Sequence, residues 1–236
     1  MLRLKLQEVA SKLSAEGIFT GGPPELFESA GRLQLVTLLY EGLLPEATVL
    51  DIGCGCLRAG YWLIRFLDPG CYCGIEPNQS MLDKGKEYLL DPELIRAKQP
   101  QFDGNDRFDF SVFGKKFDVV LARSIWSHAS KPQIEAMLDS FVSHSSPDSF
   151  FLTSYLPAAL LGRQIDRDYK GESWIGRSHQ SRQPGQIRHS RKWVESECAK
   201  RGLHAKQLGY GVFNSQHWLK ISGNRRVLED PGYRMM

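Results

Sequence analysis

Two stretches of this sequence carry residues that could bind a nucleoside-containing ligand. In residues 49–60, a short apolar strand with Asp51 leads into the turn 53–55, Gly-Cys-Gly, and then into a helix start. Glycines let the backbone of such a turn approach a ligand closely, and a helix start supplies unpaired N–H groups. Residues 71–78 read as a second buried strand that ends in Glu76, about 20 residues beyond the glycines, where an acid can bind both hydroxyls of a ribose. The pattern predicts a nucleoside-containing cofactor.

The glycine turn departs from the dinucleotide-binding pattern in two ways. That pattern needs a third glycine three residues after the second, where this chain has Arg58. Asp51 also lies two residues before Gly53, where a carboxylate would repel a pyrophosphate but could bind an ammonium group. A nicotinamide dehydrogenase therefore stays only as an alternative.

The same residues resemble the class I S-adenosylmethionine-dependent methyltransferases. Asp51-x-Gly53-x-Gly55 resembles motif I of that family, and Glu76 resembles its ribose-binding acid. The sequence departs from the family at Leu57, where many members have a third glycine, so we expect a less open turn.

The resemblance continues through most of the chain, roughly over residues 27–221. Asp109 and Phe110, followed by the segment 117–120, resemble the adenine-contacting acid, its neighbour that donates a backbone N–H, and the strand that follows them. The resemblance implies S-adenosylmethionine as cofactor. The residues expected to bind it are Asp51, Gly53, Cys54, Gly55, Glu76, Pro77, Asp109, Phe110, Ala122 and Arg123.

His128 is the best candidate for a catalytic base. It follows the expected strand 117–122, and the carboxyl ends of the strands in such a sheet form the ligand crevice. A neutral imidazole can accept the proton that a hydroxyl loses when it is methylated. The alternatives are a histidine that merely packs against the next helix, or a base at His179 or His189.

Positive charge is concentrated in one long polar segment. Residues 157–192 contain eight Lys or Arg and three Asp or Glu, whereas the whole chain has a net charge of only +3. Arginine forks bind carboxylates and phosphates, so we expect residues 157–190 to be a mobile substrate lid for an acidic acceptor, with a solvated loop as the alternative. The expected substrate residues are Arg163, Arg167, Tyr169 and Trp174.

The hydrophobic pattern predicts an α/β fold. Helices are expected at 2–16, 25–43, 58–66, 78–90, 133–143 and 190–200, and strands at 48–52, 71–75, 107–110, 117–122, 149–155, 203–208 and 217–221, with the third strand very short or near 107–110. The resemblance implies a Rossmann-like seven-stranded sheet of order 3-2-1-4-5-7-6, with helices on both faces. The expected division is an N-terminal helical cap (1–45), a cofactor-binding half (46–156), a basic insertion (157–190), a last helix with an antiparallel strand pair (191–223) and a loose tail (224–236).

Composition bears on membrane association, cell compartment and metal binding. The chain has 236 residues, no apolar run long enough for a membrane span, and five cysteines, which favour a reducing cytoplasm over a disulfide framework. The pairs Cys54/Cys56 and Cys71/Cys73 are each separated by one residue, which is not the usual spacing of zinc ligands, so no metal is expected.

We therefore expect O-methylation of a small hydroxylated metabolite, with acidic molecules among the candidates. A nucleic-acid methyltransferase is an alternative, but residues 122–125 lack the Asn/Asp-Pro-Pro-aromatic motif of base-modifying relatives. A catalytically inactive cofactor-binding partner protein is another. Oligomeric state is not predicted.

Overall fold

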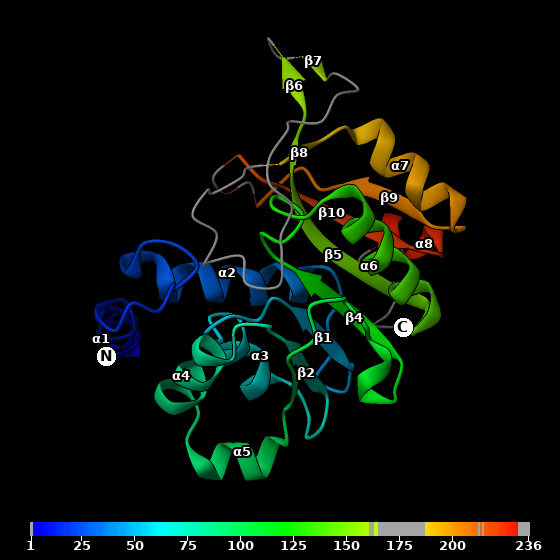
Figure 1. The fold of residues 1–236 in the computed structure, drawn as a ribbon. Coiled ribbons are helices and arrows are strands. Elements are labelled where there is room, and N and C mark those ends of the chain that lie inside the picture. The colour runs from blue at the N-terminus through cyan, green and yellow to red at the C-terminus, as the bar shows by residue number, and fades with distance from the viewer. Residues whose placement is uncertain (1, 161–162, 165–186, 212, 214, 231–236) are drawn as a thin grey trace. The chain divides into compact units, whose positions relative to one another are not determined.

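The computed structural model describes residues 2–160, 163–164, 187–211, 213 and 215–230 (Figure 1). The chain divides into two compact units, Met1–Gly104 and Asn105–Met236. The boundaries expected at residues 45, 156, 190 and 223 stay predictions.

The first unit begins with a helical segment. It consists of α1 (Leu2–Ala15), the short 3₁₀ helix η1 (Pro24–Leu26) and α2 (Phe27–Tyr40). α2 ends three residues before the expected Leu43, because Gly42 adopts a left-handed conformation (φ 93°) that closes the helix.

Three parallel strands of the first unit follow, in the order β3-β2-β1. Every residue of β1 and of β2 is buried, as is usual for strands covered on both faces. The bounds are β1 (Val49–Ile52), α3 (Gly60–Phe66), β2 (Tyr72–Ile75), α4 (Gln79–Leu89), α5 (Pro92–Lys98) and β3 (Gln101–Asp103).

The third strand is not where the sequence suggested. The alternative at 107–110 is wrong, because β3 is a three-residue strand at 101–103. The segment before it forms α5, since the Asp91 side chain accepts a hydrogen bond from Leu94 N and Pro92 occupies the first turn.

The second unit holds the strand order β4-β5-β10-β9. β4 (Phe117–Ala122) and β5 (Ser145–Pro157) are parallel, whereas β10 (His217–Ser222) is antiparallel to both β5 and β9 (His204–Gln207). With β9 and β10 as the expected strands six and seven, the orders within the two units are the 3-2-1 and 4-5-7-6 portions of the expected order.

The remaining elements of the second unit are three short strands, one 3₁₀ helix and three α-helices. β8 (Arg188–His189) pairs with the end of β5, and β6 (Ala159–Leu160) pairs with β7 (Arg163–Gln164). The other elements are η2 (Ser111–Phe113), α6 (Lys131–Ser143), α7 (Arg191–Lys200) and α8 (Arg225–Glu229).

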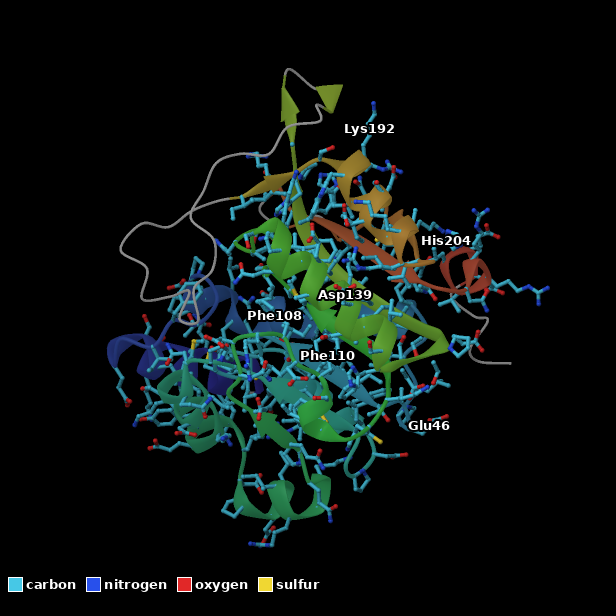
Figure 2. All side chains as sticks on the ribbon, turned by 45° about the vertical axis from the view of Figure 1, so that its right-hand side comes forward. Glu46, Phe108, Phe110, Asp139, Lys192 and His204 are labelled. Carbon is cyan, nitrogen blue, oxygen red and sulfur yellow. The ribbon has the colours of Figure 1, made fainter. Side chains whose placement is uncertain are left out.

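The tail expected from residue 224 begins instead with the short helix α8. Asn224 caps it by accepting a hydrogen bond from Arg226 N, and Val227 and Leu228 are buried. Apolar burial therefore orders the first residues of this tail. Figure 2 shows side chains of the second unit: Phe110 is fully buried, whereas Lys192 projects away from α7.

Candidate active site

Asp51 lies buried at the carboxyl end of β1. Its Oδ2 accepts a hydrogen bond of 2.9 Å from the Tyr72 hydroxyl, and both side chains are buried. Burial raises the pKa of the Asp51 carboxyl to about 7; the hydrogen bond from Tyr72 opposes this shift, and the nearby Glu76 adds to it. An approaching ammonium group would favour the ionised carboxylate.

The glycine turn is held by backbone bonds to the neighbouring strand. Gly53 N and Cys54 N both donate to Ile75 O, at 2.8 and 3.1 Å, and Gly55 N donates to Glu76 Oε2 at 3.0 Å. The backbone N–H groups of residues 53–55 therefore already have partners in the protein. Gly53 and Gly55 adopt φ values of 67° and 59°, which favour glycine.

Glu76 is fixed by backbone donors on both sides. Besides Gly55 N, Asn78 N donates to its Oε1 at 2.8 Å. Burial raises the pKa of Glu76 to about 6, and the two backbone N–H groups oppose that shift. Each carboxylate oxygen has a second lone pair, so both can still accept hydrogen bonds from ribose hydroxyls.

Leu57, at the position where many members of the resembled family have a third glycine, has a left-handed backbone conformation. Its φ is 64°, in the left-handed region, and its side chain is fully buried. A left-handed non-glycine residue costs about 1–2 kcal/mol. The left-handed conformation of Leu57 therefore has a cost in stability.

The backbone that follows the glycine turn lies in close contact with α2, with α4 and with the N-terminal segment. An added Cβ at Gly31 of α2 would lie 2.3 Å from Arg58 O, and one at Gly85 of α4 would lie 2.6 Å from the Cys56 backbone. Arg58 Nη1 donates to Gly21 O at 2.8 Å. Sequence reasoning missed both helical glycines, because a close approach between helix and loop leaves no local pattern.

Other predicted cofactor residues occupy ordinary packing positions. Cys54 is buried, which raises the pKa of its thiol well above the usual value, and Pro77 O accepts a hydrogen bond from Gln79 N. In the second unit, Ala122 is fully buried and its carbonyl accepts a hydrogen bond from Thr153 Oγ1 at 3.1 Å.

Asp109 and Phe110 are not near the ligand end of β4. The Phe110 ring lies 6.3 Å from the ring of Phe117, the first residue of β4, whereas Ala122 is the last. Asp109 Oδ1 accepts from Ser111 N and Oγ, and these bonds lower the pKa of its carboxyl. The placement argues against the expected adenine contacts, because ligands of such sheets bind at the carboxyl ends of the strands.

His128 lies in the turn after β4. It is half-buried, and its backbone N–H donates to Ile125 O at 2.9 Å. The same turn is fastened by β8, since Ile187 N donates to Ser127 O at 2.8 Å.

The side chain of His189 stabilises the turn after β4. It is fully buried, and its Nε2 lies 3.1 Å from Trp126 O and 3.0 Å from Ala129 O. Carbonyl oxygens only accept hydrogen bonds, so Nε2 carries a proton. His189 thus holds the turn that carries His128.

Arg123 follows β4 and is bound to a residue that the sequence did not single out. Its Nη1 donates to Gln216 Oε1 at 2.9 Å, across 93 residues of sequence. Of the expected substrate residues, Arg163 is described only by its backbone in β7. Arg167, Tyr169, Trp174 and the alternative base His179 lie outside the described residues.

Part of this chain is similar to known methyltransferases. Residues 50–151 match a family model described as a methyltransferase domain. The magnesium protoporphyrin IX methyltransferase of Synechocystis PCC 6803 with bound SAM has a similar structure, with a TM-score of 0.57, 18% identity, and coverage of 82% of this chain and 80% of that one.

Two further structures agree over most of their lengths. The glycopeptide N-methyltransferase MtfA with SAM has a TM-score of 0.58 at 16% identity, covering 84% of this chain and 94% of that chain. The DhpI–SAH complex has a TM-score of 0.59 at 14% identity, covering 93% and 96%. These likenesses show a Rossmann-like fold, and residues 50–151 match a methyltransferase domain. The three similar structures hold S-adenosylmethionine or its product S-adenosylhomocysteine as cofactor.

The residues of the first unit fit this cofactor. The buried Asp51 carboxyl suits an ammonium group, and the anchored Glu76 suits a pair of ribose hydroxyls. Within the described ranges of the chain, no three His, Cys, Asp or Glu side chains are grouped to hold a metal ion. No described helix has the length and apolar character needed to cross a membrane.

Proposed function

We propose that this methyltransferase transfers a methyl group from S-adenosylmethionine to a hydroxyl of a small molecule, with acidic acceptors among the candidates. The observation that carries the proposal is the pair of buried acids at the carboxyl ends of adjacent parallel strands, Asp51 in the last two residues of β1 and Glu76 directly after β2. They match two polar parts of the cofactor, its ammonium group and its ribose hydroxyls.

The methyl donor itself supplies the reactive carbon and its leaving group. Asp51 would bind the ammonium group and Glu76 the ribose, which fixes the donor. His128 would accept the proton of the acceptor hydroxyl. Because the donor is already activated, alignment of the two reactants and removal of water are the main contributions of the protein.

The acceptor class rests on two kinds of support. The similar proteins include enzymes named for magnesium protoporphyrin IX and for a glycopeptide, which are not nucleic acids. The segment 157–192 adds positive charge that suits an acidic acceptor, and a role for Arg163, Arg167, Tyr169 and Trp174 there stays a prediction. All five cysteines are free, which is compatible with a cytoplasmic enzyme.

Two measurements test this proposal. Calorimetry with S-adenosylhomocysteine and with NAD should give binding of the first only, and NAD binding alone would reject the cofactor assignment. An assay for S-adenosylhomocysteine release across a set of phenols, hydroxy acids, amines and short RNAs should respond to hydroxyl compounds. A response confined to amines or to RNA would overturn O-methylation of a small molecule, and no turnover with any acceptor would favour an inactive partner protein.

A further inference from the structure

The segment 19–22, between α1 and α2 of the first unit, is fastened to the chain that follows the glycine turn. Phe19 O accepts a hydrogen bond from Cys56 Sγ at 3.6 Å, and Gly21 O accepts one from Arg58 Nη1 at 2.8 Å. Two backbone carbonyls of this segment thus fix two side chains that lie just beyond the turn.

Gly21 lies directly against the guanidinium of Arg58. A Cβ on Gly21 would lie 2.9 Å from Arg58 Cζ and 3.0 Å from both of its terminal nitrogens. Gly21 also has a φ of 76°, and Thr20 Oγ1 donates to Gly22 O at 2.7 Å across the same bend. The guanidinium can occupy this position because residue 21 has no side chain.

Arg58 keeps its charge and most of its hydrogen-bond donors. A guanidinium stays protonated in proteins, and within the described part of the chain its bond to Gly21 O uses one of five N–H groups. Two ionisable groups, Cys56 and Asp51, lie close enough to interact with it electrostatically. Burial raises the pKa of the Cys56 thiol to about 12, so this thiol is neutral, and the buried Asp51 is the acid beside Arg58.

The amino-acid end of S-adenosylmethionine carries one ammonium group and one carboxylate. The Asp51 carboxyl suits the first of these. For the second, the backbone N–H groups of residues 53–55 already donate within the protein, and Leu57 N donates to Cys54 O at 3.0 Å. A carboxylate bound at this turn therefore needs a further donor, and the half-buried Arg58 side chain supplies one.

We propose that Arg58, held in place against Gly21, binds the carboxylate of the amino-acid end of S-adenosylmethionine while Asp51 binds its ammonium group. The planar guanidinium matches a carboxylate in geometry and charge. Each charge of the ligand then meets an opposite charge of the protein, which offsets the cost of removing both from water. The inference rests on the proposed function and adds that its donor site selects ligands with an intact amino-acid end.

A pair of probes that differ only in the carboxylate tests this inference. Protein is titrated by calorimetry at pH 8 with S-adenosylhomocysteine and with its decarboxylated analogue, in which hydrogen replaces the carboxylate. The native protein should bind S-adenosylhomocysteine roughly tenfold or more tightly than the analogue, the size expected for hydrogen bonds between charged groups. Equal affinities would overturn the inference.

Two arginine variants assign the preference to one side chain. Arg58→Met should weaken binding of S-adenosylhomocysteine, leave binding of the analogue nearly unchanged and so remove the preference. Arg65→Met is the matched control on α3, because Arg65 also donates to a backbone carbonyl, that of Tyr61, at 2.8 Å. It should keep the preference. A preference that survives in Arg58→Met, or that is lost equally in Arg65→Met, would reject the site.

A pair of glycine variants moves the guanidinium without removing its charge. Gly21→Ala and Gly17→Ala place alanine at nearly the same left-handed φ, 76° and 77°, so the backbone strain is matched. Only the first adds a carbon against Arg58, since nothing lies within 4 Å of a Cβ at Gly17. Gly21→Ala should therefore reduce the preference and Gly17→Ala should keep it. This pair decides if Arg58→Met fails to fold, and equal preferences in the two variants would overturn the inference.

The native titration separates this inference from the proposed function. A native protein that binds neither probe would defeat the proposed function. A native protein that binds both probes with the same affinity would defeat only the carboxylate site at Arg58. Melting curves on the same samples show that each variant compared is folded.

Discussion

The turns after β1 and after β4 are built by different means. The first is held by backbone N–H groups that donate to Ile75 O and to Glu76, all within 25 residues of sequence. The second is held by side chains from far along the chain, Gln216 on one side and His189 on the other. A turn held by backbone bonds keeps its shape when side chains change, whereas a turn held by side chains can be altered one residue at a time.

This difference predicts that cofactor binding and turnover separate by turn. Changes after β1 and β2 should alter the affinity for the cofactor, and changes after β4 should alter turnover or the choice of acceptor. The predictions below test that separation in order of expected size.

The largest effect is expected for His128→Ala. If His128 takes the proton of the acceptor, turnover should fall by about 10²–10⁴-fold, the range usual for a general base, while the affinity for S-adenosylhomocysteine stays nearly unchanged. Turnover and melting temperature are measured on the same sample. A fall in melting temperature with normal turnover would show that His128 only packs in its turn, which the described contact of its backbone with Ile125 also permits.

The next effect is expected for Glu76→Ala. Loss of hydrogen bonds from a charged acceptor costs about 1.5–3 kcal/mol, which is roughly a 10–150-fold weaker dissociation constant. Glu76→Gln serves as the matched variant, because its amide oxygen can still accept from Gly55 N or Asn78 N. Calorimetry with S-adenosylhomocysteine is the measurement, and an unchanged dissociation constant in folded Glu76→Ala protein would show that Glu76 does not bind the ribose.

The sequence predicts a site well where its residues are close together in the sequence, and poorly where strand pairing brings them together. The Gly53-x-Gly55 turn and Glu76 could be identified because a strand, a turn and an acid at fixed spacing leave a local pattern. Gln216 could not be identified, since only the antiparallel pairing of β10 with β5 brings it beside Ser154 and Arg123. Most helices and strands followed from periodicity and caps.

The errors have the same origin. The segment 91–103 was hard to interpret because α5 has seven residues and β3 has three, too few for a clear hydrophobic period. Asp109 and Phe110 were identified by the family resemblance and by their spacing before Asp118, which does not determine where they lie along β4. The structure places the Phe110 ring beside Phe117, the first residue of β4, and contacts of this pair with adenine stay a prediction.

A pH titration of cofactor affinity sharpens the comparison, because the raised pKa values of 7 and 6 belong to the first unit's acids. Asp51 must be ionised to bind an ammonium group, so affinity should fall about tenfold between pH 8 and pH 6 and more steeply below pH 6, where Glu76 also protonates. The effect on stability has the opposite sign: a carboxyl whose pKa is raised by folding favours the folded state below pH 4, and that contribution is lost as the pH rises to 7.

Tyr72→Phe provides the internal check of that titration. The hydrogen bond from Tyr72 lowers the pKa of Asp51, so removing it should move the fall in affinity to higher pH. Tyr88→Phe, which alters a half-buried tyrosine bound to Glu16, should leave the profile in place. A profile that is flat from pH 5 to 8 in the native protein would mean that the cofactor ammonium does not bind Asp51.

The smallest effect is expected for Gly31→Ala, which tests whether the turn after β1 depends on close backbone contact. Alanine would gain about 1 kcal/mol of helix propensity, but its Cβ would lie 2.3 Å from Arg58 O and 3.1 Å from Trp62 Nε1, and overpacking of this kind costs about 1–3 kcal/mol. We expect a net loss that lowers the melting temperature by roughly 2–4 °C, measured by calorimetry.

Gly209→Ala is the control for Gly31→Ala, because nothing lies within 4 Å of the added carbon. It should leave the melting temperature near the native value. Gly31→Ala should also weaken S-adenosylhomocysteine binding slightly, since a shift of Arg58 moves the backbone that follows the glycine turn. A rise in melting temperature with unchanged affinity would mean that α2 yields freely at this contact. The turn after β1 would then owe its position to β2 alone, through Ile75 and Glu76, and not to the N-terminal helices.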